Sequence, residues 1–191
     1  MWTSKPVKTL EDWKGLMLGV ISPPSSKLVK DLGGAPVSIM WTELFEGLQK
    51  KVIDGAIQGS HGMVNSQLYE VVKNGTIFFA IAGWNGYTIN LDVWKKMPQH
   101  IKNILQEEAD RAMDWMSDVT STKIPDMDMK VFKEKGVSIY VLPKAERERW
   151  EGIVAASTDA DLAKAGELGK KLKSIADDVN KRFPYSEKGM F

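Results

Sequence analysis

Residues 39–68 constrain the fold most, because they combine two short extended segments with an amphipathic helix between them. Leu44, Leu48 and Val52 recur every four residues, which predicts one apolar helical face. The Asp54-Gly55 pair then predicts a turn into a second short strand. Two strands joined by a crossover helix form a parallel pair. The segment therefore predicts an α/β fold.

Candidate ligand-binding residues follow these two strands. Trp41 follows the first strand, and Gln58, Ser60 and His61 follow the second. In open α/β sheets, ligands bind outside the carboxyl ends of the strands. Tryptophan and amide side chains at this edge favour a ligand with an apolar or planar surface and neutral polar groups. The alternatives are that Trp41 packs in the core and that Gln58 only satisfies loop backbone groups.

A second candidate region lies between two further predicted strands, residues 76–82 and 87–91. It contains Trp84 and Asn85 with a glycine on each side, and this position favours a role at the edge of a cleft. The alternative is a simple turn, because Asn-Gly is a common turn dipeptide.

The rest of the chain alternates between predicted strands and helices, with no internal repeat or low-complexity linker. The nearly unbroken apolar run at residues 16–21 predicts a strand buried on both faces. A long amphipathic helix is expected from Pro98 to about Thr122, with Pro125 interrupting it. The remaining predictions are strands at 35–40 and 137–142 and charged helices at 144–155 and 161–182.

Composition and charge exclude several classes of function. A formal charge of +1 gives no basic field that would attract nucleic acid or an anionic membrane. The absence of cysteine excludes thiol nucleophiles and disulfides, and two distant histidines predict neither a metal site nor a metal cofactor. Asp126 and Asp128 lack the remaining ligands of a calcium loop and are expected on the solvated surface.

Adjacent Ser60 and His61 suggest a small hydrolase as an alternative function. However, the surrounding Gly-Ser-His-Gly is not a nucleophile elbow. Neighbouring side chains on an extended segment also point to opposite faces, so His61 would not reach the Ser60 hydroxyl. The chain is therefore not expected to be an enzyme.

Several blocks occur in the order and spacing of a known family: residues 8–16, 32–37, 41–48, 52–55, 68–71 and 94–98. In these blocks the chain resembles the substrate-binding proteins of TRAP transporters, the DctP-type periplasmic receptors. The resemblance implies a lobe of the type II periplasmic-binding-protein fold, with a small mostly parallel sheet, a long hinge-spanning helix and a helical tail. It also implies capture of a small organic solute in the periplasm for TRAP membrane permease subunits, without a cofactor.

The resemblance also implies roles for individual residues. The family's carboxylate-binding arginine falls at Gly19, or at Leu18 if the following loop is one residue shorter. Because neither is an arginine, simple carboxylates are expected to bind weakly. Trp41 matches the aromatic residue beside the ligand, Gln58 the polar residue after the Asp-Gly turn, and Trp84 or Asn85 a later pocket position.

The matched blocks correspond to the C-terminal part of such a receptor, without its first lobe. Residues 1–122 are expected to form the second lobe with its connecting helix, and residues 123–191 to pack on the missing lobe. The N-terminal residues contain no apolar segment typical of an export signal. With the first lobe absent, bare strand edges and apolar helix surface are expected to make the chain a homo-oligomer, and a purely structural module is a further alternative.

Overall fold

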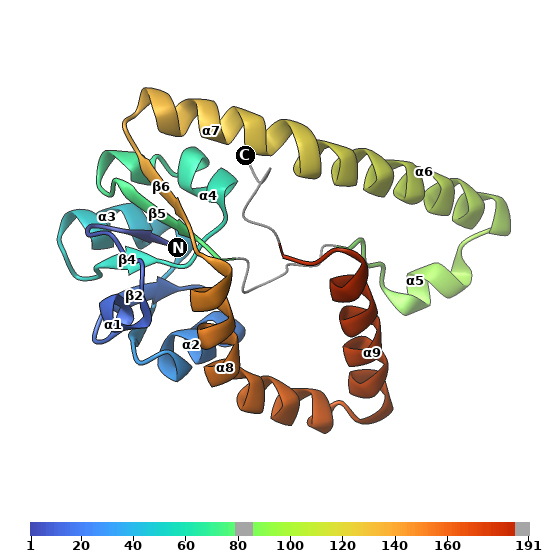
Figure 1. The fold of residues 1–191 in the computed structure, drawn as a ribbon. Coiled ribbons are helices and arrows are strands. Elements are labelled where there is room, and N and C mark those ends of the chain that lie inside the picture. The colour runs from blue at the N-terminus through green and yellow to red at the C-terminus, as the bar shows by residue number, and fades with distance from the viewer. Residues whose placement is uncertain (79–85, 186–191) are drawn as a thin grey trace.

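The fold of residues 1–78 and 86–185 is described by a computed structural model and is built on a six-stranded sheet (Figure 1). The strand order is β3-β2-β4-β1-β5-β6. The strands are β1 (Trp2–Thr3), β2 (Met17–Val20), β3 (Ala35–Ser38), β4 (Gly55–Ala56), β5 (Asn74–Ile77) and β6 (Ser138–Val141). Five strands run in one direction, and only β1 is antiparallel to its neighbours. The predicted α/β fold with a mostly parallel sheet is confirmed.

The central strand β1 has no counterpart among the sequence predictions. Its two residues pair with β4 on one side and with β5 on the other. The ladder continues to Met1, whose buried amino group donates to the Thr76 carbonyl at 3.0 Å. Burial lowers the pKa of this amino group to about 5, because the charged form loses its hydration.

Some helices cover the two faces of the sheet, and others extend away from it (Figure 1). They are α1 (Leu10–Trp13), α2 (Pro23–Asp31), η1 (Trp41–Glu43), α3 (Leu44–Gln49), α4 (Ser60–Asn65), η2 (Leu68–Glu70), α5 (Leu91–Lys96), α6 (Gln99–Asp118), η3 (Val119–Lys123), α7 (Ile124–Glu134), α8 (Lys144–Lys164) and α9 (Gly166–Arg182). On one face, Trp13 of α1 packs against Phe78 and against Trp150 of α8, with ring centroids 5.8 and 5.0 Å apart. On the other face, Leu44 and Phe132 belong to an apolar cluster formed by α3, α4 and α7.

The long helix does not stop at residue 122 as predicted. Helix α6 continues through the π-helical turn η3 into α7, so that one helix runs from Gln99 to Glu134. Pro125 is tolerated because it lies in the first turn after η3, where the widened helix accommodates a residue without an N–H group. Hydroxyl groups of Thr120 and Thr122 donate to carbonyls one turn earlier.

The boundary expected between residues 122 and 123 therefore falls inside a continuous helix. Beyond it, β6 pairs with β5 and completes the same sheet. Helix α8 then docks against α1, because Glu146 accepts from the Leu10 N–H at 2.7 Å and Arg149 forms an ion pair with Glu11. Hydrogen bonding to Arg149 lowers the pKa of Glu11 to about 2. In Figure 1, α6 and the α8–α9 pair extend away from the sheet as two arms.

The strand predicted at residues 87–91 is not formed. Residues 86–90 have no regular structure, and the Asn90 side chain accepts from the N–H groups of Asp92 and Val93 at the start of α5. The side chain of an N-cap residue accepts from N–H groups of the first helical turn, and this local hydrogen bonding competes with strand formation.

Candidate functional site

The candidate site lies at the carboxyl edge of β2, β3 and β4. Because these three strands are adjacent and parallel, the residues that follow them meet at one edge of the sheet. Three large apolar side chains are exposed after β2 and β3: Ile21 at 53%, Met40 at 66% and Trp41 at 40%. Trp41 begins η1, where Glu43 Oε2 accepts from the Met40 N–H at 3.3 Å.

Trp41 and Gln58 come together at Gly62. A Cβ atom at Gly62 would lie 2.3 Å from Gln58 Nε2 and 2.4 Å from Trp41 Cη2. Real Cβ atoms do not make such short contacts, so a larger residue at this position would displace the ends of the Gln58 and Trp41 side chains. The sequence analysis placed Trp41 and Gln58 at this edge and missed Gly62, whose role depends on contacts between distant segments.

The side-chain amide of Gln58 is the unusual polar group of this site. Both Oε1 and Nε2 are buried, and neither has a hydrogen-bond partner among the described residues. An unpaired buried amide costs about 1–3 kcal/mol, so most buried amides in proteins have partners. Gln58 therefore carries one acceptor and one donor group without partners, covered by neighbouring groups and close to the partly exposed indole of Trp41.

The backbone at Gln58 is fixed from the opposite side. Trp2 of β1 donates its indole N–H to the Gln58 carbonyl at 2.9 Å. The Trp2 ring is fully buried and lies 5.0 Å from the Phe132 ring of α7. The loop after β4 thus depends on β1 and α7, two elements that are distant from it in sequence.

Ser60 and His61 share one buried partner, Asp128 of α7. Ser60 Oγ donates to Asp128 Oδ2 at 2.7 Å, and His61 Nδ1 lies 3.1 Å from Asp128 Oδ1. The expectation that the two side chains point to opposite faces was wrong, because both residues start a helix, where neighbours are separated by about 100°. Since the Ser60 hydroxyl is bonded to the carboxylate, the arrangement lacks the serine-to-histidine contact of a hydrolase.

Asp128 itself was expected on the solvated surface, and this prediction was wrong. The residue is 1% exposed and belongs to the face of α7 that carries Phe132, one turn later. The spacing of four residues between them was the signal that could have revealed its burial.

Gly19 lies in β2 and faces the apolar layer beneath α3. A Cβ atom there would lie 2.9 Å from Ile53 Cδ1 and from Leu44 Cδ2. The stem of an arginine at this position would therefore meet packed aliphatic side chains. Trp84 and Asn85 lie outside the described residues.

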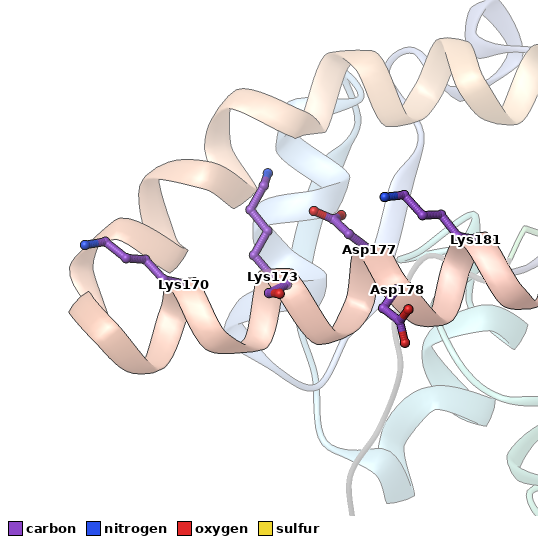
Figure 2. A pocket seen from close by; sticks show the side chains of 6 residues that line it. Lys170, Lys173, Asp177, Asp178 and Lys181 are labelled. Carbon is purple, nitrogen blue, oxygen red and sulfur yellow. The ribbon is translucent and has the colours of Figure 1, made fainter.

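Two surface hollows occur elsewhere. A groove of about 780 Å³ lies between residues 86–89, Trp94 and the apolar stripe of α6 that includes Leu105 and Met113. The other hollow lies along the exposed helix α9 and is lined mainly by charged side chains, three lysines and two aspartates (Figure 2). Neither hollow brings together buried polar groups.

Among residues 1–78 and 86–185, no helix is sufficiently long and apolar to cross a membrane. The same residues contain no group of three or more His, Asp or Glu side chains that could hold a metal ion.

Comparison with known proteins identifies one family. The model of DctP, described as "Bacterial extracellular solute-binding protein, family 7", matches residues 1–164. The sialic acid-binding periplasmic protein SiaP of Vibrio cholerae is 25% identical over 138 residues, covering 72% of this chain and 43% of that protein. The C4-dicarboxylate-binding periplasmic protein DctP of Rhodobacter capsulatus is 22% identical over 173 residues, covering 87% and 50%. The chain spans about half the length of the curated relatives it matches.

Solved structures agree with this family in fold. A TRAP periplasmic solute binding protein of Desulfovibrio salexigens with bound orotic acid superimposes with a TM-score of 0.76 at 22% identity, covering 95% of this chain and 58% of that one. A Bordetella pertussis extracytoplasmic solute receptor binding pyroglutamic acid has a TM-score of 0.76 at 21% identity, covering 91% and 57%. The chain belongs to the DctP family, the bacterial extracellular solute-binding proteins of family 7.

Proposed function

We propose that this chain is the solute-binding component of a TRAP-type transport system, in which it captures a small organic solute for delivery to membrane permease subunits. Relatives that are named periplasmic binding proteins support a place in the periplasm. Family membership supports the general role, and the arrangement at the carboxyl edge of the sheet supports the site.

The observation that carries the proposal is the unpaired Gln58 amide beside Trp41. Binding would have to displace the groups that cover the two Gln58 amide atoms, and a solute with a neighbouring C=O and N–H, such as a ring amide, would then satisfy both at once. Its planar ring would lie against the exposed indole of Trp41. Orotic acid and pyroglutamic acid, which are bound by two structural relatives, both contain a ring amide together with one carboxyl group.

Simple mono- and dicarboxylates are proposed to bind weakly. An arginine clamps a carboxylate through two parallel hydrogen bonds, and Gly19 provides none. The aliphatic groups of Ile53 and Leu44 occupy the space toward which a side chain at Gly19 would point. Recognition would therefore depend on the amide and the aromatic surface rather than on a cationic clamp.

The proposed role involves no chemical transformation. Ser60 and His61 both contact the Asp128 carboxylate, which ties the start of α4 to α7. Their contribution would be to hold the loop that carries Gln58. We also propose that the chain associates with further copies of itself and binds no nucleic acid.

The proposal can be tested by titrating the 191-residue chain with pyroglutamate, orotate and succinate in ligand-observed saturation-transfer NMR. The two ring amides are expected to bind more tightly than succinate. Trp41→Leu should weaken their binding about tenfold, equivalent to roughly 1.4 kcal/mol.

Trp115→Leu is the matched control, because Trp115 is 60% exposed on α6 and lies outside the site. Equal binding of succinate and the ring amides would contradict the proposed ligand class. Equal effects of the two tryptophan substitutions would contradict the proposed location of the site.

A further inference from the structure

Helix α9 carries an exposed apolar stripe that the solute-binding site does not use. Leu168 is 62% exposed, Leu172 50%, Ile175 51% and Val179 38%. Except for Gly169, no residue of this 17-residue helix is buried. The stripe also lies beyond residues 1–164, the part matched by the family model.

The spacing of the stripe is that of a coiled-coil seam. The intervals from Leu168 to Leu172, Ile175 and Val179 are four, three and four residues. This alternation places the four residues at successive d, a, d and a positions of a heptad repeat. A lone surface helix with this pattern leaves its whole seam in water unless another helix covers it.

The two flanks of the seam differ. A Cβ atom at Gly169 would lie 1.8 Å from the Leu162 carbonyl oxygen, so this side of α9 lies against the end of α8. At about 100° per residue, Lys171 and Asp178 lie on the opposite side of the helix. Figure 2 shows Asp178 pointing away from the side that carries Lys173 and Asp177. Lys171 and Asp178 therefore flank the seam on its open side.

We propose that α9 is a self-association surface, on which α9 of a second copy packs antiparallel about a two-fold axis. Leu172 then contacts Ile175 of the other copy, and Leu168 contacts its Val179. The same register places Lys171 opposite Asp178 of the other copy, and the symmetry repeats this pair. Opposite charges thus meet twice on the flank that α8 leaves open.

The charges also favour this direction over a parallel one. In a parallel pair in register, residues at g positions face residues at the following e positions. Lys171 would then face Ala176, and Asp178 would face Phe183. Within its own helix Asp178 pairs with Arg182 at 3.1 Å, and of the two dimers only the antiparallel one adds, across the interface, a group of opposite sign for both Lys171 and Asp178.

Sedimentation equilibrium of the 191-residue chain over a range of concentrations tests the surface. We expect a monomer–dimer equilibrium. Ile175→Asp should raise its dissociation constant at least tenfold. Ile104→Asp is the matched control, because Ile104 is 52% exposed on α6. A chain that stays monomeric at all concentrations, or a dimer that is sensitive to Ile104→Asp and not to Ile175→Asp, would overturn the proposal. Circular dichroism verifies that both variants are folded.

A charge exchange tests the register. Lys171→Glu and Asp178→Lys should each weaken the dimer, because each creates two pairs of like charge. The double variant should recover most of the lost association, because it restores two opposite pairs. If both single variants associate more weakly and the double variant does not recover the association, the antiparallel register is refuted.

Cysteine cross-linking provides an independent measurement, because the chain contains no cysteine. Leu168→Cys combined with Val179→Cys should give an oxidised dimer, whereas Leu168→Cys alone should not. Within one helix these positions are about 16 Å apart, which is too far for an internal disulfide. Efficient cross-linking of the single variant would indicate a parallel pair and refute the proposal. The proposal specifies the surface for the self-association included in the proposed function. Solute binding by Trp41 and Gln58 is measured separately, so failure of the dimer and failure of the solute-binding role are distinguishable.

Discussion

Replacing Gln58 by leucine is expected to stabilise the protein and at the same time to weaken its binding of a ring-amide solute. The two effects have one cause, because the amide atoms are buried and have no hydrogen-bond partner among the described residues. Leucine is similar in size and has no polar group that requires a partner. The substitution therefore removes a cost of folding and a binding group together.

The expected magnitudes follow from the unpaired amide. Removing a buried unsatisfied group should raise the free energy of unfolding by about 1–3 kcal/mol. For a chain of this size, the melting temperature should rise by about 2–4 °C for each kcal/mol. Loss of two hydrogen bonds to the solute should cost about 1–3 kcal/mol of binding, which corresponds to roughly 5- to 150-fold in affinity.

The assay combines chemical denaturation of the free protein with the NMR titration of pyroglutamate. Gln49→Leu is the matched control, because Gln49 is exposed at the end of α3 and its amide is solvated. This control should change the free energy of unfolding by no more than about 0.5 kcal/mol. It should leave solute binding unchanged.

A decrease in stability for Gln58→Leu would refute the reasoning, because it would mean that the amide is already satisfied in the free protein. A gain in stability without any loss of affinity would show that the amide is unpaired and not used by the solute. Only a gain in stability together with a loss of affinity supports the site.

Three further predictions concern the support of the site and the buried amino group. Asp128→Ala should lower the free energy of unfolding by about 1.5–3 kcal/mol in a denaturation assay, because Ser60 and His61 lose a charged partner. Asp126 is exposed, so Asp126→Ala should have little effect in the same assay. Gly62→Ala should weaken solute binding in the NMR titration, because its Cβ displaces Trp41 and Gln58, and unaltered binding would show that the site tolerates the displacement. In a chain with a free Met1 amino group, stability should fall as the pH is lowered from about 8 to about 5, because the unfolded amine binds a proton across this range and the folded amine does not. The loss is at most about 4 kcal/mol, and denaturation of an N-acetylated chain, which can still donate to Thr76, should lack this contribution.

The parts of the fold that have a strong local pattern could be predicted from the sequence. The apolar run around Leu18 and the helix after Trp41 indicated parallel strands with a crossover helix, and both are found, although β2 lies between the two strands that were expected to pair. The same rule placed Trp41 and Gln58 at one edge, where the structure brings them into contact with Gly62. Their role in binding a solute stays a prediction.

Other features depend on contacts that leave no local pattern. The central strand β1 has two residues, which is too short for a recognisable alternation. Pro125 was read as a helix breaker, although a π-helical turn and back-bonded hydroxyl groups allow the helix to continue. The segment 161–182 was predicted only as a charged helix, because its charged residues are more numerous than its apolar ones, and the seam was not recognised.

Asp128 illustrates how a buried polar residue can be recognised before its partner is known. It shares a helical face with Phe132, and a carboxylate on such a face must either be solvated or have hydrogen-bond partners. Its two oxygens accept from a hydroxyl and contact an imidazole, so a segment that supplies two adjacent polar side chains suits it well. Ser60 and His61 form such a segment. A polar residue on an apolar helix face is therefore evidence for a contact between elements, and here that contact holds the loop that carries Gln58.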